Sequence, residues 1–155
     1  RLQVENDSLT VMPEFGANGP GFAIMDVEVD CLFESYAEKK SCFFVVTRKG
    51  KVVGGGGIAP LKGGRAGVCE LRKMYFLREA RGFGLGKKLL DLCLKSATDL
   101  GYKECYLETL KNMTEANALY KKFGFRVLAK PAGDTGHFGC DIWYSKQLLP
   151  RAPEV

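Results

Sequence analysis

Long apolar stretches are absent from this sequence: no hydrophobic run approaches the roughly twenty residues that a membrane span needs. Dense clusters of one charge are absent as well, because the basic residues are scattered and the formal net charge is only +5. No signal peptide is visible. These absences argue against a membrane or a nucleic acid as partner. We expect a cytoplasmic protein whose mild positive charge suits a small phosphate-bearing ligand.

Patterns for metal binding and for disulfides are scarce too. The chain has a single histidine, and its six cysteines include no C-x-x-C pair. Four of the cysteines lie inside apolar runs, where a free thiol behaves as a small hydrophobic group: Cys42, Cys69, Cys93 and Cys105. We therefore expect reduced thiols in the core and no metal site.

The composition is that of an ordinary globular protein, with 155 residues of which 46% are hydrophobic and 26% charged. Because neither an internal repeat nor a linker is visible, we expect residues 1–155 to form a single domain with a tail at 149–155. The first forty residues predict a short helix near Val11 and a helix over residues 26–38. The segment 1–4 is a poor strand, so the first strand of the domain is uncertain or missing.

The middle of the chain alternates between strand and helix periods. Residues 42–60 predict a hairpin that turns at "RKGK" and whose second strand contains the glycines Gly54 to Gly57, which implies a bulge or another chain close by. Residues 68–77 predict a third strand. Its alternation puts one set of side chains on one face, namely Val68, Glu70, Arg72, Met74 and Phe76.

The remaining pattern predicts two helices and three strands. An amphipathic helix begins at Leu85 and is closed by Gly101, and a shorter one is bounded by an Asn112/Glu115 capping box and by Gly124. The remaining strands are predicted at 102–110, 125–129 and 137–149. This order of elements indicates an α/β (α+β) fold with a mostly antiparallel sheet.

The stretch "RGFGLGK", residues 81–87, places three glycines between a strand and a helix. Such a turn binds anions, because free amides of the first helical turn and the helix dipole point at the ligand. It does not match the nucleotide P-loop, since Lys87 is followed by Lys88 and not by serine or threonine. It does not match the dinucleotide G-x-G-x-x-G motif either. A turn that only caps the helix is the remaining alternative.

The R-x-x-G-x-G spacing of "RGFGLG", followed about thirty-five residues later by "ALYKKFGF", resembles the GNAT N-acetyltransferase family over roughly residues 42–148. The mid-chain segment "CELRKMYFL" and the ending "GDTGHFGCDIWY" look most like a bacterial-type subgroup, some members of which are fused to MarR-type regulators. The resemblance implies a splayed sheet flanked by helices, with acetyl-CoA in a V-shaped slot. It implies that these residues bind the cofactor: Met74, Tyr75, Phe76, Arg81, Gly82, Phe83, Gly84, Leu85, Gly86 and Lys87.

The same resemblance implies catalytic roles. Tyr120 matches the tyrosine that protonates the coenzyme A sulfur, although its apolar face is also typical of a core residue. Glu70 stands where some members keep a glutamate that deprotonates the amine. A salt bridge is the ordinary alternative for Glu70, Glu108 is a rival base, and water or no dedicated base remains open. Met113 departs from the family, which often has asparagine there, so we assign it no site role.

The acceptor pocket is expected to involve His137, Cys140 and Asp141, with the acids Asp26, Glu28 and Asp30 as a second group. The leading hypothesis is an acetyl-CoA-dependent N-acetyltransferase that acts on a primary amine of a small molecule or a lysine side chain. Such an enzyme is compatible with a homodimer. One alternative is a non-catalytic acyl-CoA-binding sensor or interaction module. Another is a nucleotide-phosphate protein unrelated to acetyl transfer.

Overall fold

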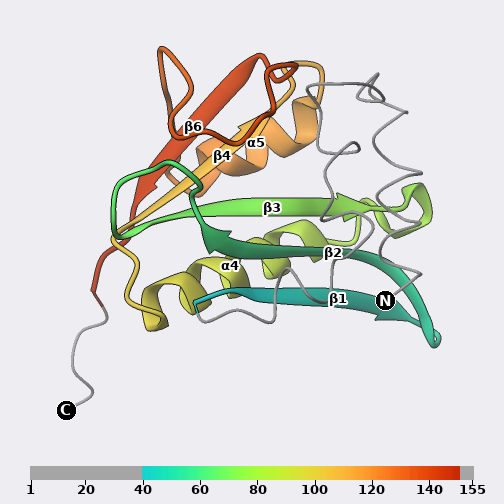
Figure 1. Cartoon of the computed structure of the whole chain (residues 1–155). Coiled ribbons are helices and arrows are strands. Elements are labelled where there is room, and N and C mark those ends of the chain that lie inside the picture. The colour runs from blue at the N-terminus through green and yellow to red at the C-terminus, as the bar shows by residue number, and fades with distance from the viewer. Residues whose placement is uncertain (1–39, 151–155) are drawn as a thin grey trace.

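A six-stranded sheet forms the centre of the computed structural model, which describes residues 40–150 (Figure 1). Its strand order is β1-β2-β3-β4-β6-β5. Every neighbouring pair is antiparallel except β3 and β4, which run parallel. The strands are β1 (Cys42–Arg48), β2 (Lys51–Pro60), β3 (Val68–Phe76), β4 (Glu104–Thr109), β5 (Arg126–Val127) and β6 (Ile142–Gln147). The predicted α+β fold with a mostly antiparallel sheet is confirmed.

The first two strands form the predicted hairpin. Lys49 and Gly50, between β1 and β2, both have positive φ angles, of 50° and 77°. A two-residue hairpin turn of this kind follows the right-handed twist of the strands it joins. The other end of the sheet is less regular than the sequence indicates. Residues 137–141 form a loop, and β6 begins only at Ile142.

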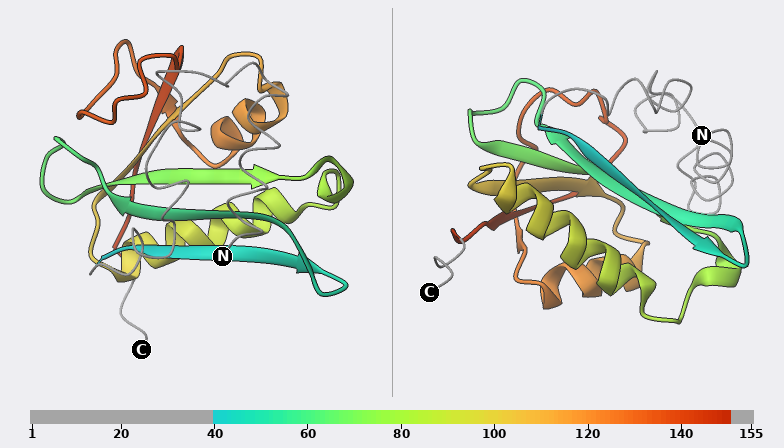
Figure 2. Two further views of the ribbon diagram at one scale, coloured as in Figure 1. Left: turned by 45° about the vertical axis from the view of Figure 1, so that its right-hand side comes forward. Right: turned by 90° about the horizontal axis from the view of Figure 1, so that it is seen from below.

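Two helices cover the same face of the sheet, as Figure 2 shows from two sides. They are α4 (Leu85–Asp99) and α5 (Thr114–Lys122), and their apolar sides share one core with the sheet. Gly101 and Gly124 end them with φ angles of 89° and 86°, as predicted. The predicted capping box is wrong. Helix α5 has Met113 at its N-cap, and no side chain caps it.

A bulge in β3 overturns the predicted alternation of that strand. Gly55 pairs with Tyr75 and Gly57 pairs with Arg72, so two residues of β3 oppose the single residue Gly56. The extra residue is Lys73, whose φ angle is +54°. Beyond it the faces exchange, and Met74 and Phe76 pack into the core with the helices instead of lying on the face of Glu70. The bulge that the glycine run implied is therefore present.

Several predictions lie outside the described residues: the helix near Val11, the helix over 26–38, the acids Asp26, Glu28 and Asp30, and most of the tail. Within the described part, the expectation of unpaired thiols is confirmed for Cys42, Cys69, Cys93, Cys105 and Cys140. The described helices are all too short or too polar to cross a bilayer.

Candidate functional site

The parallel strands β3 and β4 separate soon after they meet. Their pairing covers three positions and ends at Glu70 opposite Tyr106, after which the strands diverge (Figure 1). A slot of about 730 Å³ lies where β3 ends, bounded by the turn before α4 and by α5. This volume is in the range of cofactor pockets. The splayed sheet that the sequence predicted is thus observed, and it opens a space for a ligand of cofactor size.

The glycine turn forms one end of this slot. A short 3₁₀ turn, η2 (Arg78–Ala80), leads into it, and Gly84 serves as N-cap of α4 with a φ angle of 71°. Gly82 has a φ angle of 84°. These left-handed conformations favour glycine. A Cβ at either glycine would project into open space, so a ligand can approach the backbone there.

The electrostatics of this end suit an anion. The N-terminus of the fifteen-residue helix α4 carries a partial positive charge and amides that have no acceptor within the helix. Arg78, Arg81 and Lys87 line the same space. Arg81 is oriented by its Nε, which donates a hydrogen bond of 3.0 Å to the carbonyl of Phe76.

The structure brings together nearly all of the predicted cofactor residues. The slot is lined by all of them except Phe83. The Phe83 ring is 61% exposed, and the Arg48 guanidinium lies 4.8 Å from its centroid. Phe83 therefore ties the turn to the β1–β2 hairpin rather than facing the slot.

Tyr120 lies where the slot meets a second, smaller cavity. It is on the buried side of α5, only 6% exposed, and it lines both spaces. Within residues 40–150, no group accepts a hydrogen bond from its hydroxyl. Burial, together with the nearby Cys105 and Cys93 thiols and the Tyr144 phenol, raises the pKa of Tyr120 above its ordinary value of 10.0. The phenol consequently keeps its proton at neutral pH.

Asn117 supports Tyr120 from one turn earlier and was missed by sequence reasoning. Its Nδ2 donates to the carbonyls of Leu110 and Met113, both at 2.8 Å, and its Oδ1 accepts from the Tyr144 hydroxyl at 2.9 Å. These bonds fix the start of α5 to β6. The available signal was an asparagine three residues before Tyr120, on the same helix face.

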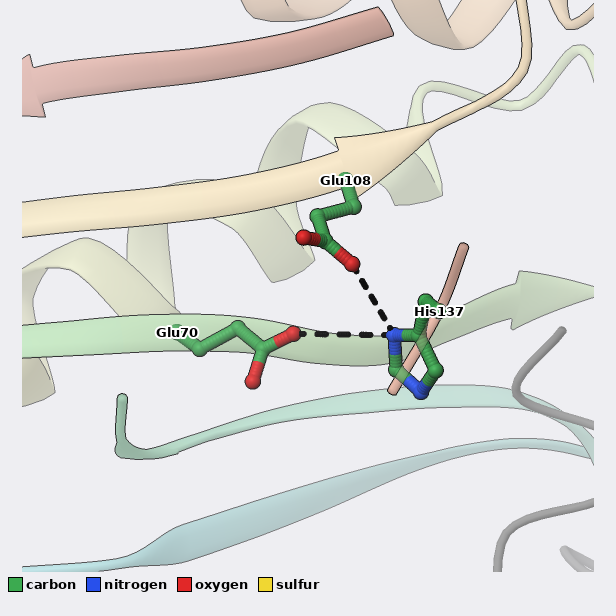
Figure 3. Close-up of side chains that lie close together, drawn as sticks. All are labelled: Glu70, Glu108 and His137. Atoms are coloured by element: carbon green, nitrogen blue, oxygen red, sulfur yellow. Dashed lines mark ion pairs between the residues drawn. The ribbon is translucent and has the colours of Figure 1, made fainter. Parts of the chain in front are cut away.

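The smaller cavity has a volume of about 70 Å³ and contains a cluster of three titratable side chains: Glu70 from β3, Glu108 from β4 and His137 from the loop before β6 (Figure 3). His137 Nδ1 lies 3.2 Å from Glu108 Oε2 and 4.0 Å from Glu70 Oε1. Figure 3 shows this nitrogen turned toward both carboxylates. We call these three residues the acid–imidazole cluster.

The two carboxylates of the cluster have opposite electrostatic environments. Burial raises the pKa of Glu70 above 4.5, even though the Arg72 guanidinium at 2.6 Å and His137 oppose the rise. Burial acts in the same direction on Glu108. There it is outweighed by hydrogen bonds from His137, Thr135 and Tyr106, which lower the pKa of Glu108. Glu70 is the carboxylate with the higher proton affinity.

The three side chains are also the one group among residues 40–150 whose ligand atoms lie close enough to hold a metal ion, within 4.8 Å of one another. Each carboxylate already has protein partners: Glu70 binds Arg72, and Glu108 accepts from Thr135 at 2.6 Å and from Tyr106 at 2.7 Å. We interpret the group as a proton-binding cluster. The absence of a metal stays a prediction.

Two of the three residues predicted for the acceptor pocket line the smaller cavity, and one does not. His137 and Cys140 line the smaller cavity. Asp141 is not among its lining residues; its carboxylate accepts a hydrogen bond of 2.8 Å from the Lys111 amide and holds the start of β6 to the segment after β4.

The chain is similar to known acetyltransferases. The model of the family described as acetyltransferase (GNAT) matches residues 8–125. The Escherichia coli (strain K12) protein named uncharacterized N-acetyltransferase YjgM is 42% identical over 139 residues, which cover 89% of this chain and 83% of that protein. A GNAT-family acetyltransferase structure from Staphylococcus aureus Mu50 gives a TM-score of 0.74 at 19% identity, covering 96% of this chain and 92% of that one. PaiA N-acetyltransferase of Thermoplasma acidophilum, solved with coenzyme A, gives 0.61 at 21%, covering 77% and 68%.

Proposed function

Since the chain belongs to the acetyltransferase (GNAT) family, we propose that it transfers the acetyl group of acetyl-CoA to a primary amine, carried by a small molecule or by a lysine side chain. The family establishes the enzyme class, an acetyl-CoA-dependent N-acetyltransferase. The acceptor and the roles of individual residues are our proposal. One observation supports it most strongly: the slot and the smaller cavity share the lining residues Met74, Tyr75, Met113 and Tyr120. A donor in the slot and an amine in the cavity would therefore meet beside Tyr120.

The slot is the proposed seat of acetyl-CoA. Its glycine turn and the N-terminus of α4 would hold the pyrophosphate, and the end of β3 would lie along the pantetheine arm. When bound, acetyl-CoA supplies a thioester whose carbonyl carbon is attacked by the amine. The ladder between β2 and β3 is interrupted at Lys73, next to Met74. We place the backbone N–H that polarises the carbonyl at this bulge.

Glu70 is the proposed general base. Its side chain is 3% exposed, it lines the smaller cavity, and burial raises its pKa. A carboxylate with increased proton affinity is better matched to removing a proton from an amine. Glu108 fits this role less well, because its two oxygens accept from Tyr106 and Thr135 and its pKa is lowered.

Tyr120 is the proposed general acid. Its hydroxyl holds a proton at neutral pH because its pKa is raised, and it lies at the junction of the two spaces. As the carbon–sulfur bond breaks, the electron pair goes to sulfur, and Tyr120 would donate its proton there. Glu70 would carry the proton taken from the amine, so the protons balance.

We propose that the enzyme is cytoplasmic, has no resident metal and binds neither nucleic acid nor membrane. A homodimer is compatible with this proposal. We also propose that residues 1–155 form one domain, related to the subgroup that is sometimes fused to MarR-type regulators.

The test is a thiol-release assay with acetyl-CoA over amino acids, polyamines, arylalkylamines and peptides. Only a neutral amine attacks, and lysine titrates near 10.4, so kcat/KM at low acceptor should rise from about pH 6 to about pH 9. Glu70→Gln should weaken that rise. Identical profiles for the variant and the wild type would exclude Glu70 as base. Binding of acetyl-CoA without thiol release from any acceptor class would indicate a non-catalytic acyl-CoA-binding module instead.

A further inference from the structure

The imidazole of His137 occupies an unusual position for a loop side chain. It is 11% exposed, and its Nδ1 faces two carboxylates that are each 3% exposed. Nδ1 lies 3.2 Å from Glu108 Oε2, and since a carboxylate oxygen only accepts, we assign a hydrogen to Nδ1. The other ring nitrogen, Nε2, is therefore the one that takes up a proton when the imidazole becomes charged and releases it when the imidazole becomes neutral. Figure 3 shows Nε2 on the opposite edge of the ring.

Glu108 holds the imidazole in this place. Its Oε2 also accepts from the Thr135 hydroxyl at 2.6 Å, and its Oε1 accepts from the Tyr106 hydroxyl at 2.7 Å. The Tyr106 oxygen in turn accepts from the Ala132 amide at 3.0 Å. One carboxylate on β4 thus anchors the loop at residues 132, 135 and 137. Its role is to position His137.

The charges around Glu70 are nearly balanced. On its own strand, Arg72 donates to Glu70 Oε2 at 2.6 Å, and Lys73 lines the same cavity. Strand β4 contributes Glu108 and the Tyr106 phenol, and the loop contributes His137. When His137 is protonated, the carboxylates of Glu70 and Glu108 face the cations of Arg72, Lys73 and the imidazolium. A proton added to Glu70 increases the excess of positive charge in this buried cluster, which is unfavourable.

We propose that Glu70 and His137 form a charge-compensating pair: when Glu70 Oε1 takes the proton of the acceptor amine, the N–H bond at His137 Nε2 breaks and that proton passes to solvent. The cluster charge then stays constant during the transfer, and Glu108 keeps the two groups 4.0 Å apart. The amine step rests on the proposed function, whereas the coupling between the two side chains does not.

The chain offers a direct test because His137 is its single histidine, so one imidazole NMR signal reports on it without assignment. Charges about 4 Å apart in a buried site couple by about one pH unit or more, so we expect Glu70→Gln to lower the midpoint of this titration by at least about one unit. Glu108→Gln should lower it at least as much. Glu104→Gln is the matched control on the same strand; its carboxylate binds Arg65 and Ser145, and the midpoint should not move.

The wild-type signal tests the proposal even where a variant fails to fold. A coupled pair titrates with a broadened or two-step curve, whereas an independent imidazole follows a simple one-proton curve. A one-proton curve would overturn the proposal, and so would a midpoint that Glu70→Gln leaves unchanged. Neither readout requires an acceptor, so the proposed function can fail while the pair is confirmed.

A kinetic measurement connects the pair to turnover. His137→Gln keeps an amide donor for Glu108 but cannot be charged, so Glu70 should remain protonated to higher pH. We expect the acidic limb of kcat/KM to move up by about one pH unit in this variant. Glu104→Gln is again the control, because its carboxylate on the same strand binds Arg65 and Ser145, and it should leave the limb in place. An unshifted limb in His137→Gln would contradict the coupling during catalysis.

Discussion

The slot and the acid–imidazole cluster lie side by side, yet the slot is formed mainly by backbone and the cluster by side chains. The slot takes its character from backbone: left-handed glycines, the first turn of α4 and a break in the β2–β3 ladder. The cluster consists of side chains that come from two strands and a loop. Backbone groups offer the same amides whatever residues surround them, whereas a side-chain cluster changes its charge and shape with each substitution.

This contrast suggests that the slot and the acid–imidazole cluster tolerate different kinds of substitution. A backbone cradle recognises phosphate through fixed dipoles and needs little from the side chains beyond space. The cluster depends on the balance between burial and hydrogen bonding, which gives Glu70 and Glu108 opposite pKa shifts although both are 3% exposed. Substitutions that add a side chain should damage the slot, and substitutions that remove one should damage the cluster.

The largest effect is expected at Gly84, where Gly84→Asp puts a negative charge at the N-terminus of α4. Aspartate accepts a left-handed conformation better than most residues, and its Cβ meets open space, so the fold should persist. We expect acetyl-CoA affinity to fall by about a hundredfold or more, measured by calorimetry. Gly84→Asn is the uncharged control and should bind more tightly than the aspartate variant. Affinity near the wild-type value in Gly84→Asp would exclude the turn as the pyrophosphate site.

A smaller effect, on turnover alone, is expected at the junction of the two spaces. Tyr120→Phe keeps the ring and removes the proposed acid, so kcat should fall roughly ten- to a thousandfold while acetyl-CoA affinity stays within a few-fold. Tyr144→Phe is the matched control, since its ring lies 5.8 Å from that of Tyr120. It should instead cost about 1–3 kcal/mol of stability, because it leaves Asn117 Oδ1 without its donor. Normal turnover in Tyr120→Phe would make Tyr120 a core residue only.

The smallest effect concerns acid stability and tests whether Glu108 is structural. Its pKa is lowered below 4.5, so the stability that it contributes is present above that pH and is lost as pH falls through the lowered pKa. Glu108→Gln lacks this contribution. The difference in free energy of unfolding between wild type and variant should therefore be largest near neutrality and shrink below pH 4.5 in denaturant titrations. A difference independent of pH would contradict the role of the hydrogen bonds to Glu108.

The same contrast explains what could be predicted from the sequence. The glycine turn was predictable because positive φ angles at Gly82 and Gly84 require a particular residue type at a fixed spacing. The reversal of faces after Lys73 was not, because a lysine with a φ angle of +54° has no such signature and the bulge depends on Gly56 of the neighbouring strand. Sequence also named Glu70, Glu108 and His137 separately. Their meeting depends on strand register and on how the loop before β6 folds back, which are properties of the whole sheet.

The bulge at Lys73 also acts as a half-period phase shift in strand β3. In a regular strand Glu70, Met74 and Phe76 are an even number of residues apart and would all face the same way. With one residue added, Glu70 faces the acid–imidazole cluster, while Met74 and Phe76 face the helices and border the slot. A single strand consequently contributes to both spaces: Glu70, before the bulge, lines the smaller cavity, Phe76, beyond it, lines the slot, and Met74 lines both.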